Sequence, residues 1–242
     1  MPFAVDIHFK SRHTPYAVWC RYPLRIIIIM FNLFDPNSDF QIIAGSNLPH
    51  WFQPQATYFI TFRTEDSLPA DVARRWHAER STWLAQHGIS TSIPNWKDKL
   101  ARLEKKFRKQ FHEMFSQRYM ENLNKGLGAC VLKQPKLSKI VADSLLYFNG
   151  SRYHMGDFVI MPNHVHLLVC LLGDTNLLKQ CRSWKKFSAG KINKVLGRTG
   201  RFWQEESFDH LVRSPEQFCA IQEYIRKNPS HLQNDEYFLY EI

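Results

Sequence analysis

The sequence lacks several features that would place it in a simple class. Its cysteines are odd in number and no two have C-x-x-C spacing, which argues against a zinc ribbon and against a disulfide framework. It has only 10 Gly and 12 Pro in 242 residues, so it is neither collagen-like nor dominated by linkers. Its most apolar N-terminal stretch, residues 26–34, is far shorter than the about 20 residues of a membrane span. We therefore expect a cytoplasmic globular protein without a membrane partner.

Basic residues are in excess. The chain has 32 Lys+Arg against 22 Asp+Glu, which gives +10 with His neutral, and 44% hydrophobic residues, enough for a packed core. Such a charge suggests a polyanionic partner, with nucleic acid ahead of an anionic membrane surface. A basic run at residues 97–109 is typical of a solvated helix face, and contact with DNA is the alternative.

One segment concentrates this charge. From residue 179 to 201 there are eight basic residues and no acidic one. A solvated helix normally mixes charges of both signs, so this pattern favours contact with a phosphate backbone. Phe187, Phe202 and Trp203 lie among the charges and could stack on unpaired bases, whereas Trp184 fits a core position equally well. The basic residues are Lys179, Arg182, Lys185, Lys186, Lys191, Lys194, Arg198 and Arg201.

The order of expected elements indicates an α+β fold. Two apolar runs separated by Pro162-Asn163 predict an antiparallel hairpin, and Ser214-Pro215 with Gln217 predicts a capped helix that ends before Pro229. We expect a ferredoxin-like antiparallel sheet with covering helices on one face. The expected strands are 57–62, 158–161, 164–169 and 208–212, and the expected helices are 70–86, 100–124, 136–149, 175–196 and 215–228.

His164 and His166 lie two residues apart on an expected strand. Side chains alternate across a strand, so both imidazoles face one side, opposite the apolar core positions Val165, Leu167 and Val169. Two histidines on a rigid strand make half of a divalent-metal site. The alternative is a pair of half-exposed histidines on an edge strand.

Tyr224 and Asn228 lie four residues apart on the last expected helix and therefore share one of its faces. Phe218, Ile221 and Ile225 form the apolar stripe beside them. One hypothesis makes Tyr224 a nucleophile and Asn228 a third metal ligand that donates its amide oxygen. The other is a packing tyrosine and a helix-terminal asparagine.

Several motifs, taken in order, resemble the single-tyrosine transposases that carry an HUH motif (His, hydrophobic, His), and among them the branch of REP-associated tyrosine transposases. Together they cover about residues 47–230, without a counterpart for 66–100. The segments that carry the resemblance are 48–51 (LPHW), 57–62 (TYFITF), 161–169 (MPNHVHLLV), 200–204 (GRFWQ), 208–210 (FDH) and 224–229 (YIRKNP).

The resemblance implies an HUH endonuclease fold and a metal-dependent single-stranded DNA endonuclease and strand transferase, acting through a covalent 5′-phosphotyrosine. His164, His166 and Asn228 match the metal ligands, with Mg²⁺ or Mn²⁺ as the cofactor, and Tyr224 matches the nucleophile. The implied partner is single-stranded DNA that forms hairpins, bound by a monomer or homodimer that associates with the nucleoid. DNA transposition or the processing of repeated hairpin elements is the implied role.

The expected organisation is an N-terminal extension over 1–46, a transposase domain over 47–230 and a C-terminal tail over 231–242. Two other functions stay open. One is a catalytically silent nucleic-acid-binding module of the same fold, and the other is a zinc-dependent hydrolase built on the histidine pair.

Overall fold

The computed structural model describes residues 30–44, 49–68, 70–91, 96–111, 114–115, 126–205 and 207–242 of the chain. These residues fall into two compact units, one within 66–129 and the other holding the described parts of 30–65 and 130–242. The smaller unit therefore lies inside the range 47–230 that we expected to be one domain.

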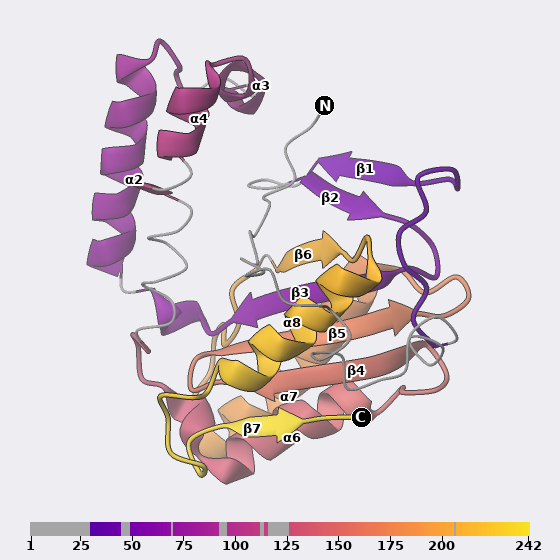
Figure 1. The fold of residues 1–242 in the computed structure, drawn as a ribbon. Helices are drawn as coiled ribbons and strands as arrows, with labels where there is room; N and C mark the ends of the chain where they lie inside the picture. Colours follow the sequence, from indigo (N-terminus) through magenta and orange to yellow (C-terminus); the bar gives the residue numbers. More distant parts are fainter. Residues whose placement is uncertain are drawn as a thin grey trace. The chain divides into compact units, whose positions relative to one another are not determined.

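The larger unit is α+β, as the sequence predicts. Its five strands form an antiparallel sheet in the order β6-β3-β5-β4-β7 (Figure 1). β4 and β5 form the expected hairpin, in which Met161 N donates to His164 O at 2.8 Å around Pro162-Asn163. The strands are β3 (Thr57–Arg63), β4 (Tyr153–Ile160), β5 (His164–Leu171), β6 (Phe208–Leu211) and β7 (Phe238–Tyr240).

One face of the sheet packs on helices α6 (Pro135–Leu146) and α7 (Leu177–Leu196). Alternate residues of the central strands, among them Ile60 and Leu167, are fully buried there. Trp184 is a core residue of α7, and its indole N–H donates to Tyr153 Oη at 2.9 Å. That hydroxyl donates in turn to Leu145 O at 2.7 Å, so the buried indole N–H of Trp184 and the buried hydroxyl of Tyr153 are both satisfied.

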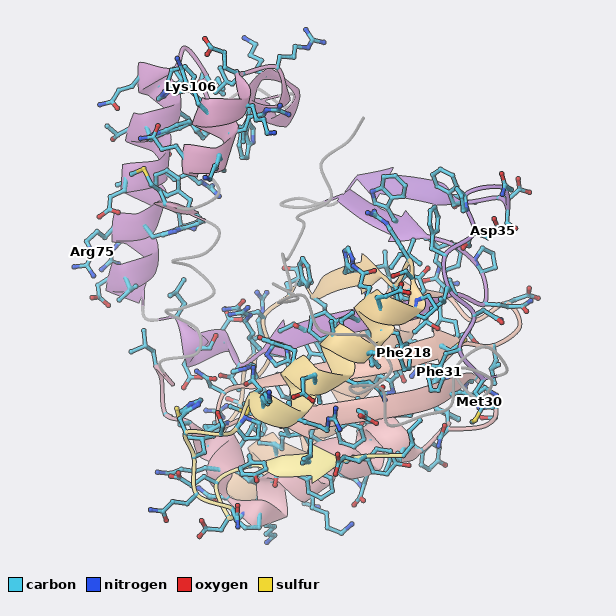
Figure 2. All side chains as sticks on the ribbon, viewed as in Figure 1. Met30, Phe31, Asp35, Arg75, Lys106 and Phe218 are labelled. Atoms are coloured by element: carbon cyan, nitrogen blue, oxygen red, sulfur yellow. The ribbon has the colours of Figure 1, made fainter. Side chains whose placement is uncertain are left out.

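The other face is covered by α8 (Pro215–Lys227), which lies across the sheet on the side away from α6 and α7 (Figure 1). Phe218 of α8 meets Phe31 with ring centroids 5.1 Å apart (Figure 2). The expectation that helices cover only one face is therefore wrong. Helix α8 is an amphipathic helix like the others, and a central strand that is buried on both faces, as β3 and β5 are, needs a second covering layer.

Segments from both ends of the chain belong to this unit. Phe34 N donates to Val212 O at 2.8 Å, and β1 (Gln41–Ala44) pairs with β2 (Pro49–Phe52) in a two-stranded sheet. β7 pairs with β4, with the Tyr240 and Phe158 rings stacked at 4.8 Å. Residues 30–44 and 231–242, expected outside the domain, thus contribute to it, and the rest of the expected extension, residues 1–29, lies outside the described residues.

The smaller unit consists of helices around an aromatic cluster that includes Trp83 and Phe115. Its helices are α2 (Ala70–Gln86), α3 (Trp96–Ala101) and α4 (Lys105–Phe111). α2 has the expected bounds, but the helix expected over 100–124 is interrupted by a turn at residues 102–104, where Leu103 N donates to Leu100 O at 3.2 Å. Residues 112–113 and 116–124 of that expected helix lie outside the described residues.

Two further expectations concern bilayers and cysteines. Among the described residues, no helix is both long enough and apolar enough to cross a bilayer. Cys130, Cys170 and Cys181 are free thiols, whereas Cys219 is disulfide-bonded. One disulfide-bonded cysteine beside three free thiols does not make the disulfide framework that the sequence argues against.

Short 3₁₀ helices complete the described elements: η2 (Glu65–Ser67) and η4 (Val131–Lys133).

Candidate active site on the sheet face beneath helix α8

His164 and His166 lie on the face of β5 that α8 covers. Their ring centroids are 4.7 Å apart, and in the antiparallel register they lie opposite Arg63 and Thr61 of β3. The expectation that they share one face is confirmed. The alternative of half-exposed histidines on an edge strand is wrong, because β5 is central and the two residues are only 3% and 1% exposed.

Each histidine is held at Nδ1 by a neighbour. His164 Nδ1 lies 2.7 Å from Asn163 Oδ1, and His166 Nδ1 lies 2.7 Å from Thr61 Oγ1. An amide oxygen only accepts, so Nδ1 of His164 carries the proton and its Nε2 keeps a lone pair. The Thr61 hydroxyl can accept from His166 in the same way. Both Nε2 atoms are then free to act as ligands or acceptors.

Tyr224 approaches this pair from α8. Its hydroxyl is 3.3 Å from His166 Nε2, and its ring meets His166 and Phe59 edge-to-face with centroids 5.1 and 5.9 Å away. Ser214 caps the helix as expected, its hydroxyl accepting from Gln217 N. The buried stripe that includes Phe218 fixes the rotation of α8, which leaves Tyr224 half-buried at the margin.

Asn228 is the C-cap of α8, and its backbone N–H donates to Tyr224 O at 2.9 Å. The four-residue spacing therefore brings both side chains to the same region, as expected. The Asn228 amide interacts with His164 and acts to raise the pKa of that imidazole. It makes no hydrogen bond of good geometry with Nε2, which has no hydrogen-bond partner among the described residues.

Burial controls the charge of the pair. Burial first, and the Arg63 guanidinium next, lower the pKa of His164 to about 3 against the smaller opposing effect of Asn228. Burial, His164 and Arg63 together hold the pKa of His166 well below its usual value. Both imidazoles are therefore neutral near pH 7, the form in which histidine ligates metals.

These donors fit a divalent metal ion. The orphaned Nε2 of buried His164 is a polar atom that normally has a partner, and His166 Nε2 and the Asn228 amide lie beside it. No group of three or more His, Cys, Asp or Glu able to hold a metal exists among the described residues, so the donor set is two imidazoles and one amide oxygen. Mixed nitrogen and oxygen ligands suit Mn²⁺ better than Mg²⁺, which prefers oxygen.

The basic residues of α7 are on the other face of the sheet from Tyr224. Five of them are exposed on the outer side of the helix, and two more lie beyond its end: Arg198, over the Phe202 ring at 4.9 Å, and Arg201, 3.9 Å from Glu65 and 3.7 Å from Glu205. The five are Lys179, Arg182, Lys186, Lys191 and Lys194.

Lys185 differs from its neighbours. It is buried, and its Nζ donates to Gln204 O at 3.1 Å and to Glu205 O at 2.6 Å. Its expected contact with DNA is therefore wrong, because its charge is used to hold the chain after α7. Phe202 and Trp203 are also buried, at 1% and 4% exposure, and cannot stack on bases; Phe187 remains exposed.

The sequence did not indicate Thr61, Arg63 or Asn163 as site residues. Thr61 and Arg63 join the site through the register of β3 with β5, which the sequence does not specify. Asn163 could have been found, because it is the turn residue directly before the histidine pair and Asn side chains in turns often bond to neighbours in sequence.

Comparisons with known proteins are sparse. No protein-family model matches the chain. An uncharacterized protein of Haemophilus influenzae is 27% identical over 104 aligned residues, a match covering 34% of this chain and 58% of that protein. A solved structure of a REP-associated tyrosine transposase bound to a REP hairpin aligns with 77% of this chain and 74% of its own, at 14% identity and a TM-score of 0.41. A likeness that low carries no argument, so the function rests on the site.

Proposed function

We propose that this chain is a transposase-type enzyme of the HUH class, a metal-dependent endonuclease and strand transferase for single-stranded DNA. The observation that carries the proposal is the position of the Tyr224 hydroxyl, 3.3 Å from His166 Nε2 and beside His164 and Asn228. Nearby metal coordination is one of the ways in which a weak nucleophile such as a tyrosine hydroxyl is activated for covalent catalysis.

His164, His166 and Asn228 would hold the metal ion. When bound, a divalent cation polarises a phosphoryl oxygen and stabilises the charge that develops on it. Thr61 and Asn163 fix the rings so that both Nε2 atoms serve the site. Arg63, buried beside both histidines, supplies a fixed positive charge that attracts the anionic phosphate into a site of low dielectric constant.

Tyr224 carries out the covalent step. Its oxygen forms a bond to phosphorus while the bond between phosphorus and the 3′-oxygen breaks, so the hydroxyl proton leaves Tyr224 and a proton reaches the released 3′-OH. The proton from Tyr224 passes to water, because His166 Nε2 would already be bound to the metal ion. The reverse step uses a 3′-OH as nucleophile, which rejoins a strand without ATP because the phosphodiester energy is kept in the phosphotyrosine.

A cleavage assay tests this function. A hairpin-forming single strand, labelled at either end, should be cut in Mn²⁺ or Mg²⁺ and stay intact in EDTA. His164→Gln, which keeps a side chain of similar polarity in a buried position, should lose cleavage. His154→Gln is the matched control, since His154 is half-buried at the far end of the same sheet and pairs across to Cys170.

Three results would overturn the proposal. Binding of the strand without cleavage in any divalent metal would favour the silent nucleic-acid-binding module. Cleavage by His164→Gln at the wild-type rate would show that the histidine pair is not the reacting site. Hydrolysis of a non-nucleic-acid ester in Zn²⁺ alone would favour the zinc hydrolase.

A further inference from the structure

Helices α6 and α7 expose aromatic rings on their outer side. Tyr147, the C-cap of α6, is 72% exposed, and Phe187 of α7 is 44% exposed. Their ring centroids are 6.5 Å apart, with an angle of 31° between the planes. Aromatic side chains normally contribute to a core or an interface, and these two are in neither within the described unit. We call the surface formed by Tyr147, Lys186, Phe187, Gly190 and Lys191 the α6–α7 face.

The α6–α7 face is strongly basic. No acidic residue occurs between Asp174 and Glu205, and Nζ of Lys191 lies 4.4 Å from the centre of the Phe187 ring. The nearby acid on α6, Asp143, is already bonded to Lys139 at 2.8 Å. Rings and cations interleaved in this way are the features that bind unpaired bases and their phosphates together.

Gly190 supplies an independent indication. It lies in the interior of α7, where glycine weakens a helix relative to alanine. It is exposed, and a Cβ added there would have no atom within 4 Å, so packing does not require glycine. One turn from Phe187, its bare backbone leaves room for a ligand to approach the helix closely.

We propose that the α6–α7 face binds single-stranded DNA, with unpaired bases stacked on Tyr147 and Phe187 and phosphates on Lys186 and Lys191. The choice of DNA rests on the proposed function. The surface is a second contact, because the sheet separates α6 and α7 from α8, the helix that carries Tyr224 (Figure 1). It therefore holds a stretch of strand away from the cleaved phosphate and contributes to affinity. The bases of a duplex are already stacked on one another, so only its phosphates can bind to the α6–α7 face.

Binding without cleavage tests the rings. In the Tyr224→Phe variant and EDTA, anisotropy of a labelled single strand should show Phe187→Leu and Tyr147→Ala binding about 5- to 150-fold more weakly. Phe187→Tyr keeps a ring and should bind as the parent does. An unchanged affinity in Phe187→Leu, or a duplex of equal length bound as tightly as the single strand, would overturn the proposal. Tighter binding of the matching RNA would overturn DNA as the occupant.

Gly190 and the lysines give separate readouts. Gly190→Leu should raise the melting temperature of the free protein and weaken binding, so that stability and affinity move in opposite directions. Replacing Lys186 and Lys191 by Ala should lower the slope of log affinity against log salt by about 1.4, or about 0.7 per lost phosphate contact. Lys139→Ala, which removes the paired lysine of α6, is the control and should leave both the affinity and its salt slope unchanged. Wild-type affinity in Gly190→Leu would contradict close approach to the helix.

The two proposals fail in distinguishable ways. Weaker binding in Phe187→Leu without cleavage in any metal would support the α6–α7 face and refute the nuclease. Normal cleavage with no effect of Phe187, Tyr147 or Gly190 on affinity would support the nuclease and refute the α6–α7 face.

Discussion

Removing the side chain of Asn163 should weaken metal binding while the ligands themselves stay in place. The Oδ1 atom of Asn163 accepts from His164 Nδ1 at 2.7 Å, which fixes the ring and keeps the lone pair on Nε2. Loss of such an outer hydrogen-bond partner costs about 10- to 100-fold in metal affinity or activity. That range equals about 1.4 to 2.8 kcal/mol. Asn163→Ala should therefore bind Mn²⁺ 10- to 100-fold more weakly, whereas Asn163→Asp keeps an acceptor and should bind at least as well as wild type.

Titration of Mn²⁺ by electron paramagnetic resonance measures this affinity directly and needs no DNA. Asn176→Ala is the matched control, because Asn176 caps α7 by accepting from Lys179 N. Its loss should cost about 1 kcal/mol of stability and leave the affinity for Mn²⁺ unchanged. Equal Mn²⁺ affinity in Asn163→Ala and wild type would refute the argument that Asn163 sets the ring of a ligand, and the same loss in Asn176→Ala would assign the effect to stability.

Three further predictions follow from buried charges. Arg63→Gln should slow cleavage of a normal strand much more than cleavage of one with a neutral methylphosphonate at the scissile position, because the guanidinium acts on phosphate charge; an equal effect on both substrates would refute that role. Burial raises the pKa of Asp157 from 3.8 to about 6. The folded state therefore holds this proton more tightly than the unfolded state, and the free energy of unfolding falls as the pH rises through 6. Asp157→Asn should raise the free energy of unfolding at pH 8 by up to about 3 kcal/mol. Denaturant titrations measure this gain, which should vanish near pH 4. Lys185→Gln should lower the melting temperature yet leave the salt slope of DNA binding unchanged, and a lower slope would return Lys185 to the DNA-contacting set.

Local patterns predicted the parts of the site that depend on one element. Alternation along β5 placed His164 and His166 together, and the helical period placed Tyr224 and Asn228 together. The N-cap at Ser214 and the hairpin turn at Pro162-Asn163 also depend on neighbours in sequence. Such features need only the geometry of a single strand, helix or turn.

Features that depend on packing between elements were not predicted. Burial of the histidine pair requires α8 to cover the second face of the sheet, and Arg63 enters through the β3–β5 register. Lys185 is an intermediate case. It follows Trp184 on the buried stripe with Ser188, so helical periodicity alone indicated an inward position, which the concentration of charge in 179–201 obscured.

Mapping a covalent adduct tests the central claim most directly. A single strand labelled at its 3′ end should stay attached to the protein through its 5′-phosphate on a denaturing gel, in divalent metal and not in EDTA. After reduction of the Cys219 disulfide, trypsin should release residues 214–226 (SPEQFCAIQEYIR), a peptide whose single tyrosine is Tyr224, with the nucleotide mass added. Tyr224→Phe should abolish the adduct. An adduct that persists in Tyr224→Phe, or that maps to Tyr147, Tyr153, Tyr237 or Tyr240, would contradict the account.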